Sequence, residues 1–306
     1  MACYGAAAGS RGRESYASSW TDEMTMRAMP FSSHYATVLS REIHYTQWGD
    51  PTLPVLVAAH GLARTGRDMD ELAAWFCGRY RVLCPDTIGR GLSQWSTDAD
   101  AEYCMDFYVR HVTALLDALG VERMAWVGTS MGGAIGTVAA AGALKGRLTH
   151  LVLNDSAPQL AAAAITRIRA YAGNPAAFDT VTELEQYFRT VYKPYGWLSD
   201  EQWRRMTETS ARRLPDGRLT PHYDPQIVRQ FHRPRDEYLL WEEYDSLTLP
   251  VFCLRGARSD LVLRETTEQM KRRGPRAQVV EIEGCGHAPA LNTPDQLELI
   301  ERFLDA

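Results

Sequence analysis

The sequence lacks several features that mark nucleic-acid-binding, secreted and membrane proteins. Its 306 residues carry 33 Lys and Arg against 38 Asp and Glu, a net charge of -5, so no overall positive field attracts nucleic acid or anionic lipid. Six cysteines form no Cys-x-x-Cys pair and no zinc-ligand spacing, which favours reduced thiols in a cytoplasmic protein. The longest uncharged run, residues 125–144, contains five glycines, so we predict a buried turn and helix there rather than a membrane span.

The first thirty residues also lack the unbroken apolar stretch that a secretory signal needs. We predict that residues 1–30 form a disordered leader, with Met24, Met26 and Met29 as alternative starts. The rest of the chain has the composition of an ordinary globular protein, because 45% of all residues are hydrophobic and 23% are charged. A large buried core is therefore available.

From residue 35 onward, short apolar runs alternate with longer helical patterns, which is typical of a mostly parallel sheet covered by helices on both faces. The first two runs predict a hairpin and the others predict buried strands. The predicted strands are 35–39, 43–48, 55–59, 82–84, 124–127, 151–153, 251–254 and 279–282, and the predicted helices are 68–76, 104–119, 131–143, 264–273 and 294–304. These residues, 31–155 and 247–306, are expected to form the catalytic domain.

The alternation breaks between residues 156 and 246, where no convincing buried strand appears. Thr180-x-x-Glu183 and Ser199-x-x-Gln202 have the pattern of capping boxes that open amphipathic helices. We predict that residues 156–246 are an inserted helical cap. Its many aromatic side chains either pack together or line a pocket.

The segment Gly128-x-Ser130-x-Gly132 follows an apolar strand and precedes a helix of small residues, as in a nucleophile elbow. A serine on so tight a turn needs neighbours without bulky side chains, and the two glycines meet that need. The turn also places Ser130 at the amino end of a helix, where free N–H groups favour a developing oxyanion. Ser130 is therefore the candidate nucleophile.

A serine hydroxyl needs a base that accepts its proton and a carboxylate that orients the base. His287 is the only histidine after residue 232, and it lies in a glycine-flanked loop past the last predicted strand. For the acid we favour Asp260, which follows the strand 251–254. Asp155, directly after the strand 151–153, is the competing position.

An oxyanion hole requires two backbone N–H groups aimed at the tetrahedral oxygen. We assign one to Met131, which follows the nucleophile, and the other to Leu62, in the loop after the strand 55–59. His60 lies beside that second loop, and we predict a hydrogen-bonding brace rather than a general base. The loop Asp86-x-x-Gly89-x-Gly91-x-Ser93 is predicted to be structural.

Taken in order, these motifs resemble those of the α/β-hydrolase superfamily, over nearly the whole chain from residue 35 except the cap. The resemblance implies an eight-stranded, mostly parallel sheet, a triad matched by Ser130, Asp260 and His287, and no cofactor or metal. Serine at the nucleophile position argues against the dehalogenase and epoxide hydrolase branches, which use aspartate. The cap sequence 216–225 resembles that of bacterial carboxylesterases acting on hydroxyalkanoate esters or oligomers.

The expected activity is hydrolysis of carboxylic esters through an acyl-enzyme on Ser130. A carbon-carbon bond hydrolase or a lactonase with the same triad is the alternative, since the pocket rather than the fold decides the substrate. A binding protein that keeps the fold without catalysis is a further alternative. The expected partner is a small ester; a homo-oligomer stays open, and neither nucleic acid nor a membrane is expected.

Overall fold

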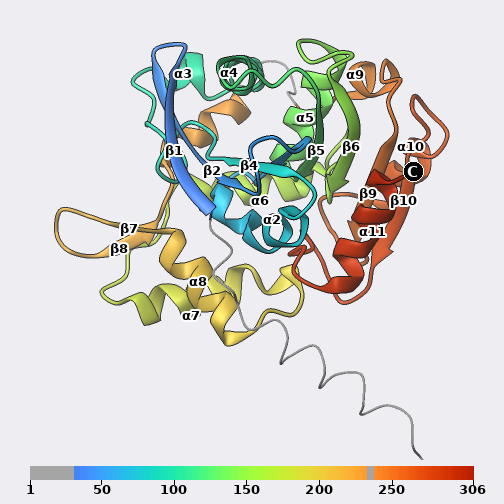
Figure 1. The fold of residues 1–306 in the computed structure, drawn as a ribbon. Coiled ribbons are helices and arrows are strands. Elements are labelled where there is room, and N and C mark those ends of the chain that lie inside the picture. Colours follow the sequence, from blue (N-terminus) through green and yellow to red (C-terminus); the bar gives the residue numbers. More distant parts are fainter. Residues whose placement is uncertain (1–30, 233–237) are drawn as a thin grey trace, which may run out of the picture. The chain divides into compact units, whose positions relative to one another are not determined.

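The computed structural model describes residues 31–232 and 238–306, so the predicted leader 1–30 lies outside the described residues. Residues Phe31–Ala306 pack as one compact unit. Its eight-stranded sheet has the order β1-β2-β4-β3-β5-β6-β9-β10 (Figure 1). The strands are β1 (Phe31–Val38), β2 (Arg41–Trp48), β3 (Val55–Ala59), β4 (Arg81–Pro85), β5 (Met124–Thr129), β6 (Leu148–Asn154), β9 (Val251–Gly256) and β10 (Gln278–Ile282).

Strand direction follows the connections along the chain. β1 and β2 form an antiparallel hairpin, and β2 pairs antiparallel with β4. All remaining neighbours are parallel, because each pair is joined by a crossover through other elements. The prediction of a mostly parallel, eight-stranded sheet is confirmed.

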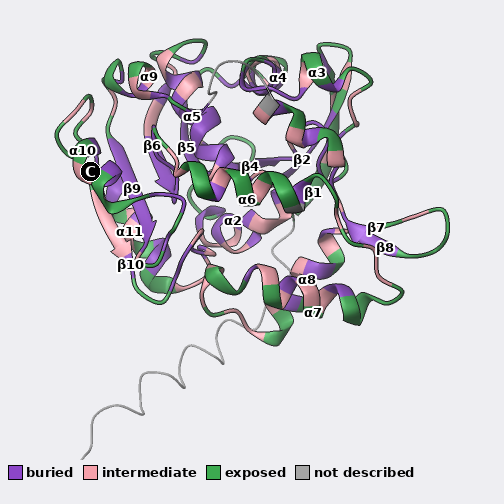
Figure 2. Ribbon diagram, turned by 180° about the vertical axis from the view of Figure 1, so that it is seen from behind, coloured by how far each residue is buried: buried purple, intermediate pink, exposed green. Residues whose placement is uncertain are grey.

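Helices cover both faces of the sheet, as Figure 1 shows. Successive strand residues point to opposite faces, and in β5 Trp126 packs in one core cluster while Val127 packs in the other. The helices outside the segment between β6 and β9 are η1 (Gly66–Met69), α2 (Asp70–Phe76), α3 (Ala99–Glu102), α4 (Met105–Ala118), α5 (Met131–Ala141), α10 (Arg264–Met270) and α11 (Pro294–Leu304). The central strands β5, β6 and β9 are almost entirely buried (Figure 2).

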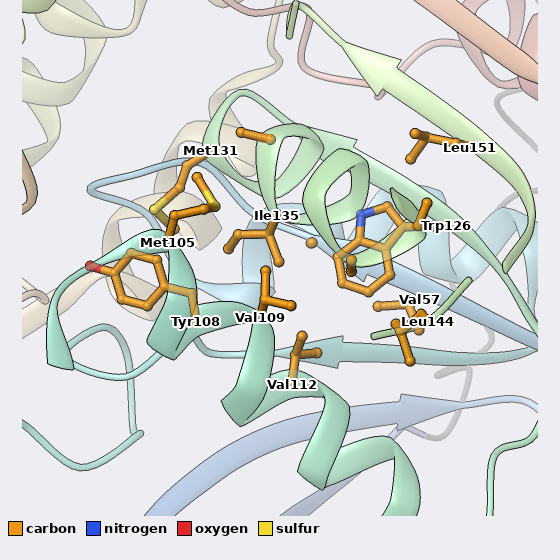
Figure 3. Packing of buried hydrophobic residues seen from close by; sticks show 14 of the residues in the cluster. Val57, Met105, Tyr108, Val109, Val112, Trp126, Met131, Ile135, Leu144 and Leu151 are labelled. Carbon is orange, nitrogen blue, oxygen red and sulfur yellow. The ribbon is translucent and has the colours of Figure 1, made fainter. Parts of the chain in front are cut away.

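The helix that follows the candidate nucleophile is embedded in this core. Met131 and Ile135 of α5 lie against Tyr108 and Val109 of α4, and the Trp126 ring of β5 lies beside the same helix (Figure 3). The indole N–H of Trp126 donates to the Gly132 carbonyl at 2.9 Å. The base of the turn at residue 130 is therefore held by close packing and by a buried hydrogen bond.

The segment between β6 and β9 has its own small core. It contains α6 (Ala162–Ala172), α7 (Val181–Val191), η2 (Lys193–Tyr195), α8 (Asp200–Thr209), β7 (Ala211–Arg213), β8 (Leu219–Pro221), η3 (Pro225–His232) and α9 (Trp241–Asp245). Phe188 and Trp203 pack together in it, and both predicted capping boxes are present. The segment is less purely helical than predicted, because β7 and β8 form a short hairpin.

No helix in the described part of the chain is both long enough and apolar enough to span a bilayer.

Candidate active site

Ser130 occupies a strained turn between β5 and α5. Its φ of 53° and ψ of -116° lie outside the regions that residues with a side chain prefer. A Cβ on Gly128 would lie 2.3 Å from the Gly132 carbonyl oxygen, and a Cβ on Gly132 would lie 2.3 Å from that of Ala59. Both distances are too short for any side chain, so the turn requires the two glycines predicted from the sequence.

The same turn aims a helix amino terminus at the serine. The Ser130 carbonyl accepts hydrogen bonds from the N–H groups of Gly133 and Ala134, at 2.9 and 3.1 Å, as the first bonds of α5. The Met131 N–H belongs to the first turn, where a helix has no internal acceptor. It therefore has the position that a donor to an oxyanion next to Ser130 needs.

His287 pairs with Asp155. The ring Nδ1 of His287 lies 2.6 Å from Asp155 Oδ2, and the carboxylate is fully buried. An ionised carboxylate only accepts hydrogen bonds, so Nδ1 carries the proton and Nε2 is left with the free electron pair. This is the tautomer that a base acting on a serine hydroxyl must have.

Asp155 is held by two further donors, one from the end of β9 and one from the loop that follows it. The Gly256 N–H donates to Oδ1 at 2.8 Å, and the Ser259 hydroxyl donates to Oδ2 at 2.6 Å. The Asp155 backbone has a φ of 46°, and its N–H donates to the Leu254 carbonyl. β6 and β9 are parallel neighbours. The carboxylate at the end of β6 therefore lies beside the loop that follows β9.

The prediction that Asp260 pairs with His287 is wrong. Asp260 is 56% exposed, and its carboxylate forms an ion pair with Arg167 of α6 at 2.5 Å. The hydrogen bond from Arg167 holds the pKa of the Asp260 carboxyl below its usual value. The physical reason is the tight turn after β9, where the Ser259 N–H bonds back to the Gly256 carbonyl. This turn faces the Ser259 side chain inward to Asp155, and the next side chain points to the surface.

Asn154 ties the serine turn to the histidine loop, a role that the sequence did not indicate. Its carbonyl accepts from the Ser130 N–H at 2.9 Å. Its side-chain amide donates to Thr129 Oγ1 at 2.9 Å and to the Pro289 carbonyl at 2.8 Å. One buried side chain thus connects the residue before Ser130 to a residue just after His287. A polar residue at the end of a buried strand was the only available signal.

The loop that carries Leu62 lies against the nucleophile. A Cβ on Gly61 would lie 3.7 Å from Ser130 Cβ, and a turn closes where the Arg64 N–H bonds to the Gly61 carbonyl. The buried Arg90 joins both predicted oxyanion residues, since Nε donates to the Leu62 carbonyl at 2.9 Å and Nη2 lies 3.4 Å from Met131 Sδ. Leu62 and Met131 are therefore held by one guanidinium.

His60 is a brace, as predicted. Its Nε2 accepts from the Thr87 N–H at 3.0 Å, so Nδ1 carries the proton and donates to the Gly61 carbonyl at 2.6 Å. Burial lowers the pKa of the imidazole, which favours this neutral form. Both ring nitrogens are used, and neither is available for proton transfer.

The segment before α8 contacts the histidine loop directly. The Gly286 N–H donates to the Pro194 carbonyl at 2.7 Å, and the Ala290 N–H donates to that of Tyr195 at 3.1 Å. A cavity of about 50 Å³ lies beside them, and Gly61 and Thr129 are among its lining residues. Within residues 31–232 and 238–306, no three or more His, Cys, Asp or Glu side chains gather as a metal site would require.

The sequence of the chain is similar to a protein family and to known proteins. Residues 54–294 match the family described as alpha/beta hydrolase fold. A 3-hydroxybutyrate-oligomer hydrolase of Cupriavidus necator is 42% identical over 269 residues, which cover 85% of this chain and 91% of the relative. A 2-(acetamidomethylene)succinate hydrolase of Mesorhizobium japonicum is 25% identical over 83% of this chain and 88% of the relative.

The architecture also matches solved structures. An alpha/beta hydrolase from Novosphingobium aromaticivorans superimposes with a TM-score of 0.80 and 31% identity, over 90% of this chain and 98% of that one.

Proposed function

Because the chain belongs to the α/β-hydrolase family and is a hydrolase, we propose that it is a serine esterase with Ser130 as nucleophile, His287 as base and Asp155 as acid. The observation that carries this proposal is the buried Asp155 carboxylate on His287 Nδ1, combined with a serine on a strained turn at a helix amino terminus. Leu62 and Met131 are the proposed donors to the oxyanion.

The reaction has two steps. The Ser130 hydroxyl gives its proton to His287 Nε2 and attacks the ester carbonyl, and the negative oxygen that forms is stabilised by the Leu62 and Met131 N–H groups. The leaving alcohol takes the proton from His287, and an acyl-enzyme remains. Water then gives a proton to the same nitrogen while its oxygen bonds to the acyl carbon. The bond from that carbon to the Ser130 oxygen breaks, His287 returns the proton to this oxygen, and the acid is released. Asp155 stabilises the imidazolium in both steps.

We propose short hydroxyalkanoate esters, and oligomers of 3-hydroxybutyrate in particular, as substrates. The support is the 42% identity to the 3-hydroxybutyrate-oligomer hydrolase over most of both chains. In such an oligomer each ester joins a carboxyl to a secondary alcohol. One attack by Ser130 therefore leaves the part of the oligomer on the carbonyl side of the ester as an acyl group on the enzyme, and frees the other part with a new hydroxyl group.

Residues 156–246 are proposed to act as the cap over this site. Two observations support this role: the segment has a hydrophobic cluster of its own, and it hydrogen-bonds to the loop of His287 through Pro194 and Tyr195. A cap in this place determines which esters reach Ser130. We also propose that the enzyme works in the cytoplasm, since its buried cysteines Cys84, Cys253 and Cys285 are free thiols.

Hydrolysis of purified 3-hydroxybutyrate dimer and trimer by Ser130→Ala tests the proposal. The variant should lose at least about three orders of magnitude in kcat, because the site of His287 and Asp155 then has no nucleophile. Ser246→Ala is the matched control, since Ser246 is an exposed serine just after α9 whose hydroxyl donates to the nearby Glu243 carbonyl. Full turnover by Ser130→Ala would reject the mechanism, and cleavage of a vinylogous diketone but of no ester would favour a carbon-carbon bond hydrolase.

A further inference from the structure

A second Ser–His–Asp chain lies on β1, β2 and the end of β4, and β3 separates these strands from β5, which leads to Ser130. Ser33 Oγ of β1 is 2.8 Å from His44 Nε2 of β2, and His44 Nδ1 is 2.7 Å from Asp86 Oδ2, just after β4. Tyr35 pairs with His44, and Ser33 pairs with Thr46. Ser33 and His44 are thus diagonal neighbours on one face of the hairpin, within reach of each other.

The surroundings of the Asp86 carboxyl favour its ionised form. It is 2% exposed, and it accepts hydrogen bonds from the Gly66 N–H at 2.6 Å and the Leu92 N–H at 2.9 Å in addition to His44. Burial by itself raises the pKa of this carboxyl, but the hydrogen bonds outweigh burial and the pKa is lowered. An ionised Asp86 requires the proton of His44 on Nδ1, so Nε2 accepts the hydroxyl proton of Ser33.

The serine of this chain is accessible. Ser33 is exposed, and with His44 and Asp86 it lines a cavity of about 330 Å³, which is within the range of small-molecule sites. Thr65 and Arg67 line the same cavity. The Thr65 hydroxyl is buried and has no hydrogen-bond partner among the described residues, so a donor is available to a bound molecule, whereas the Arg67 guanidinium is paired with Asp70.

The neighbouring serine provides an internal comparison. Ser32 Oγ lies 2.6 Å from His34 Nε2, and Ser32 is also exposed. In the described part of the chain no carboxylate hydrogen-bonds to the His34 ring. The two serines are adjacent and each contacts an imidazole, but only Ser33 has the complete chain to an acid.

We propose that Ser33 is a second reactive serine, which takes the acyl group of small activated esters. In this step the Ser33 hydroxyl gives its proton to His44 Nε2, and its oxygen bonds to the ester carbonyl carbon. The bond from that carbon to the leaving oxygen breaks, and the alcohol departs with the proton from His44. The product is an acylated Ser33 and a free alcohol, so all atoms and electrons balance.

Labelling by a small fluorophosphonate, which reacts with activated serines as an ester does, tests this proposal in full-length Ser130→Ala. Intact-mass measurement should show one adduct, and tandem mass spectrometry of the tryptic peptide 28–41 should place it on Ser33 and not on Ser32. Adding Ser33→Ala should abolish the adduct, whereas adding Ser32→Ala should leave its rate unchanged. His44→Gln should slow labelling about 100-fold, because the base is removed.

Three results of this labelling experiment would contradict the proposal. A folded Ser130→Ala protein without an adduct on Ser33, or with equal adducts on Ser32 and Ser33, would overturn the proposal. So would an unchanged labelling rate in His44→Gln. If the melting temperature of His44→Gln differs from that of the parent, two other results decide the outcome. The mapping of the adduct locates it on one serine, and Ser33→Ala removes only one exposed hydroxyl. Neither result depends on whether Ser130 hydrolyses esters.

Discussion

A single carboxylate, that of Asp155, connects three parts of the candidate active site. Its oxygens accept hydrogen bonds from His287, Gly256 and Ser259, and its left-handed backbone turns the side chain from the end of β6 toward β9. Buried carboxylates are costly unless every oxygen is satisfied. The His287 ring, the Gly256 N–H and the Ser259 hydroxyl supply these hydrogen bonds, and in the described residues no arginine or lysine hydrogen-bonds to Asp155.

Replacing Asp155 with Asn is predicted to lower kcat by up to about four orders of magnitude, because the amide favours the wrong tautomer of His287. Asp260→Asn removes a carboxylate of the same size that lies at the surface with Arg167, and it should keep nearly full activity. Steady-state hydrolysis of a p-nitrophenyl ester measures both. Loss of activity in Asp260→Asn with retention in Asp155→Asn would reverse the assignment.

Ser259→Ala is predicted to reduce kcat by about 10- to 100-fold with little change in KM. The Ser259 hydroxyl donates to the charged Asp155 oxygen, and a hydrogen bond to a charged group contributes about 1.5–3 kcal/mol. Ser259→Thr keeps the donor and should recover most of the rate, which separates this positioning role from a general loss of packing. A Ser259→Ala enzyme with parental kcat would contradict the role.

At the scale of elements, the active-site loops approach one another too closely for side chains. A Cβ on Gly256, at the end of β9, would lie 2.0 Å from the Gly286 carbonyl oxygen in the histidine loop. The loop of His287 is therefore positioned by backbone contacts with the end of β9 on one side and with Pro194 on the other. Close backbone packing keeps the base in one place.

Gly256→Ala should destabilise the protein by about 1–3 kcal/mol, since the new methyl group must displace the histidine loop. It should also lower kcat. Gly78→Ala is the matched control, because no atom lies within 4 Å of the Cβ that it adds, and its effect should stay within about 0.5 kcal/mol. Urea unfolding measures the stability and ester hydrolysis measures kcat. Equal free energies of unfolding for the two variants would contradict this prediction, because they would show that the histidine loop moves without destabilising the protein.

At the scale of the whole molecule, burial of neutral histidines links stability to pH. Burial lowers the pKa values of His60, His111 and His222. The unfolded chain protonates these rings near pH 6.5, whereas the folded protein resists protonation until a lower pH. Between each folded pKa and about pH 6.5 the unfolded state binds more protons, so stability falls as the pH falls.

The free energy of unfolding is therefore predicted to decrease between pH 7.5 and pH 5.5. Urea denaturation at several pH values measures this slope. His111→Gln should flatten the slope, since it removes one buried ring whose Nε2 has no hydrogen-bond partner among the described residues. Constant stability over this range, or an unchanged slope in His111→Gln, would contradict the account.

Much of this organisation could be predicted because it is local in the sequence. The strand–Gly128-x-Ser130-x-Gly132–helix pattern defines its own turn, and the last helix begins at Pro294 and ends at Leu304 as its capping pattern indicates. The partner of His287 could not be fixed in this way. Asp155 and Asp260 both follow buried strands, and only the turn Gly256–Ser259, which directs Ser259 inward, decides between them. The cross-strand chain of Ser33, His44 and Asp86 depends on sheet register and had no signal in the sequence.

The most direct test of the central claim is to trap the reaction at the acyl-enzyme. The enzyme is mixed with a p-nitrophenyl ester, quenched in acid during turnover and analysed by intact-mass and peptide mass spectrometry. The account predicts an acyl group on Ser130 in the wild-type protein, formed on the time scale of turnover, whereas the peptide of residue 130 carries none in Ser130→Ala, whatever acyl group Ser33 carries. Product formation at the full rate with Ser130 unmodified throughout would contradict it.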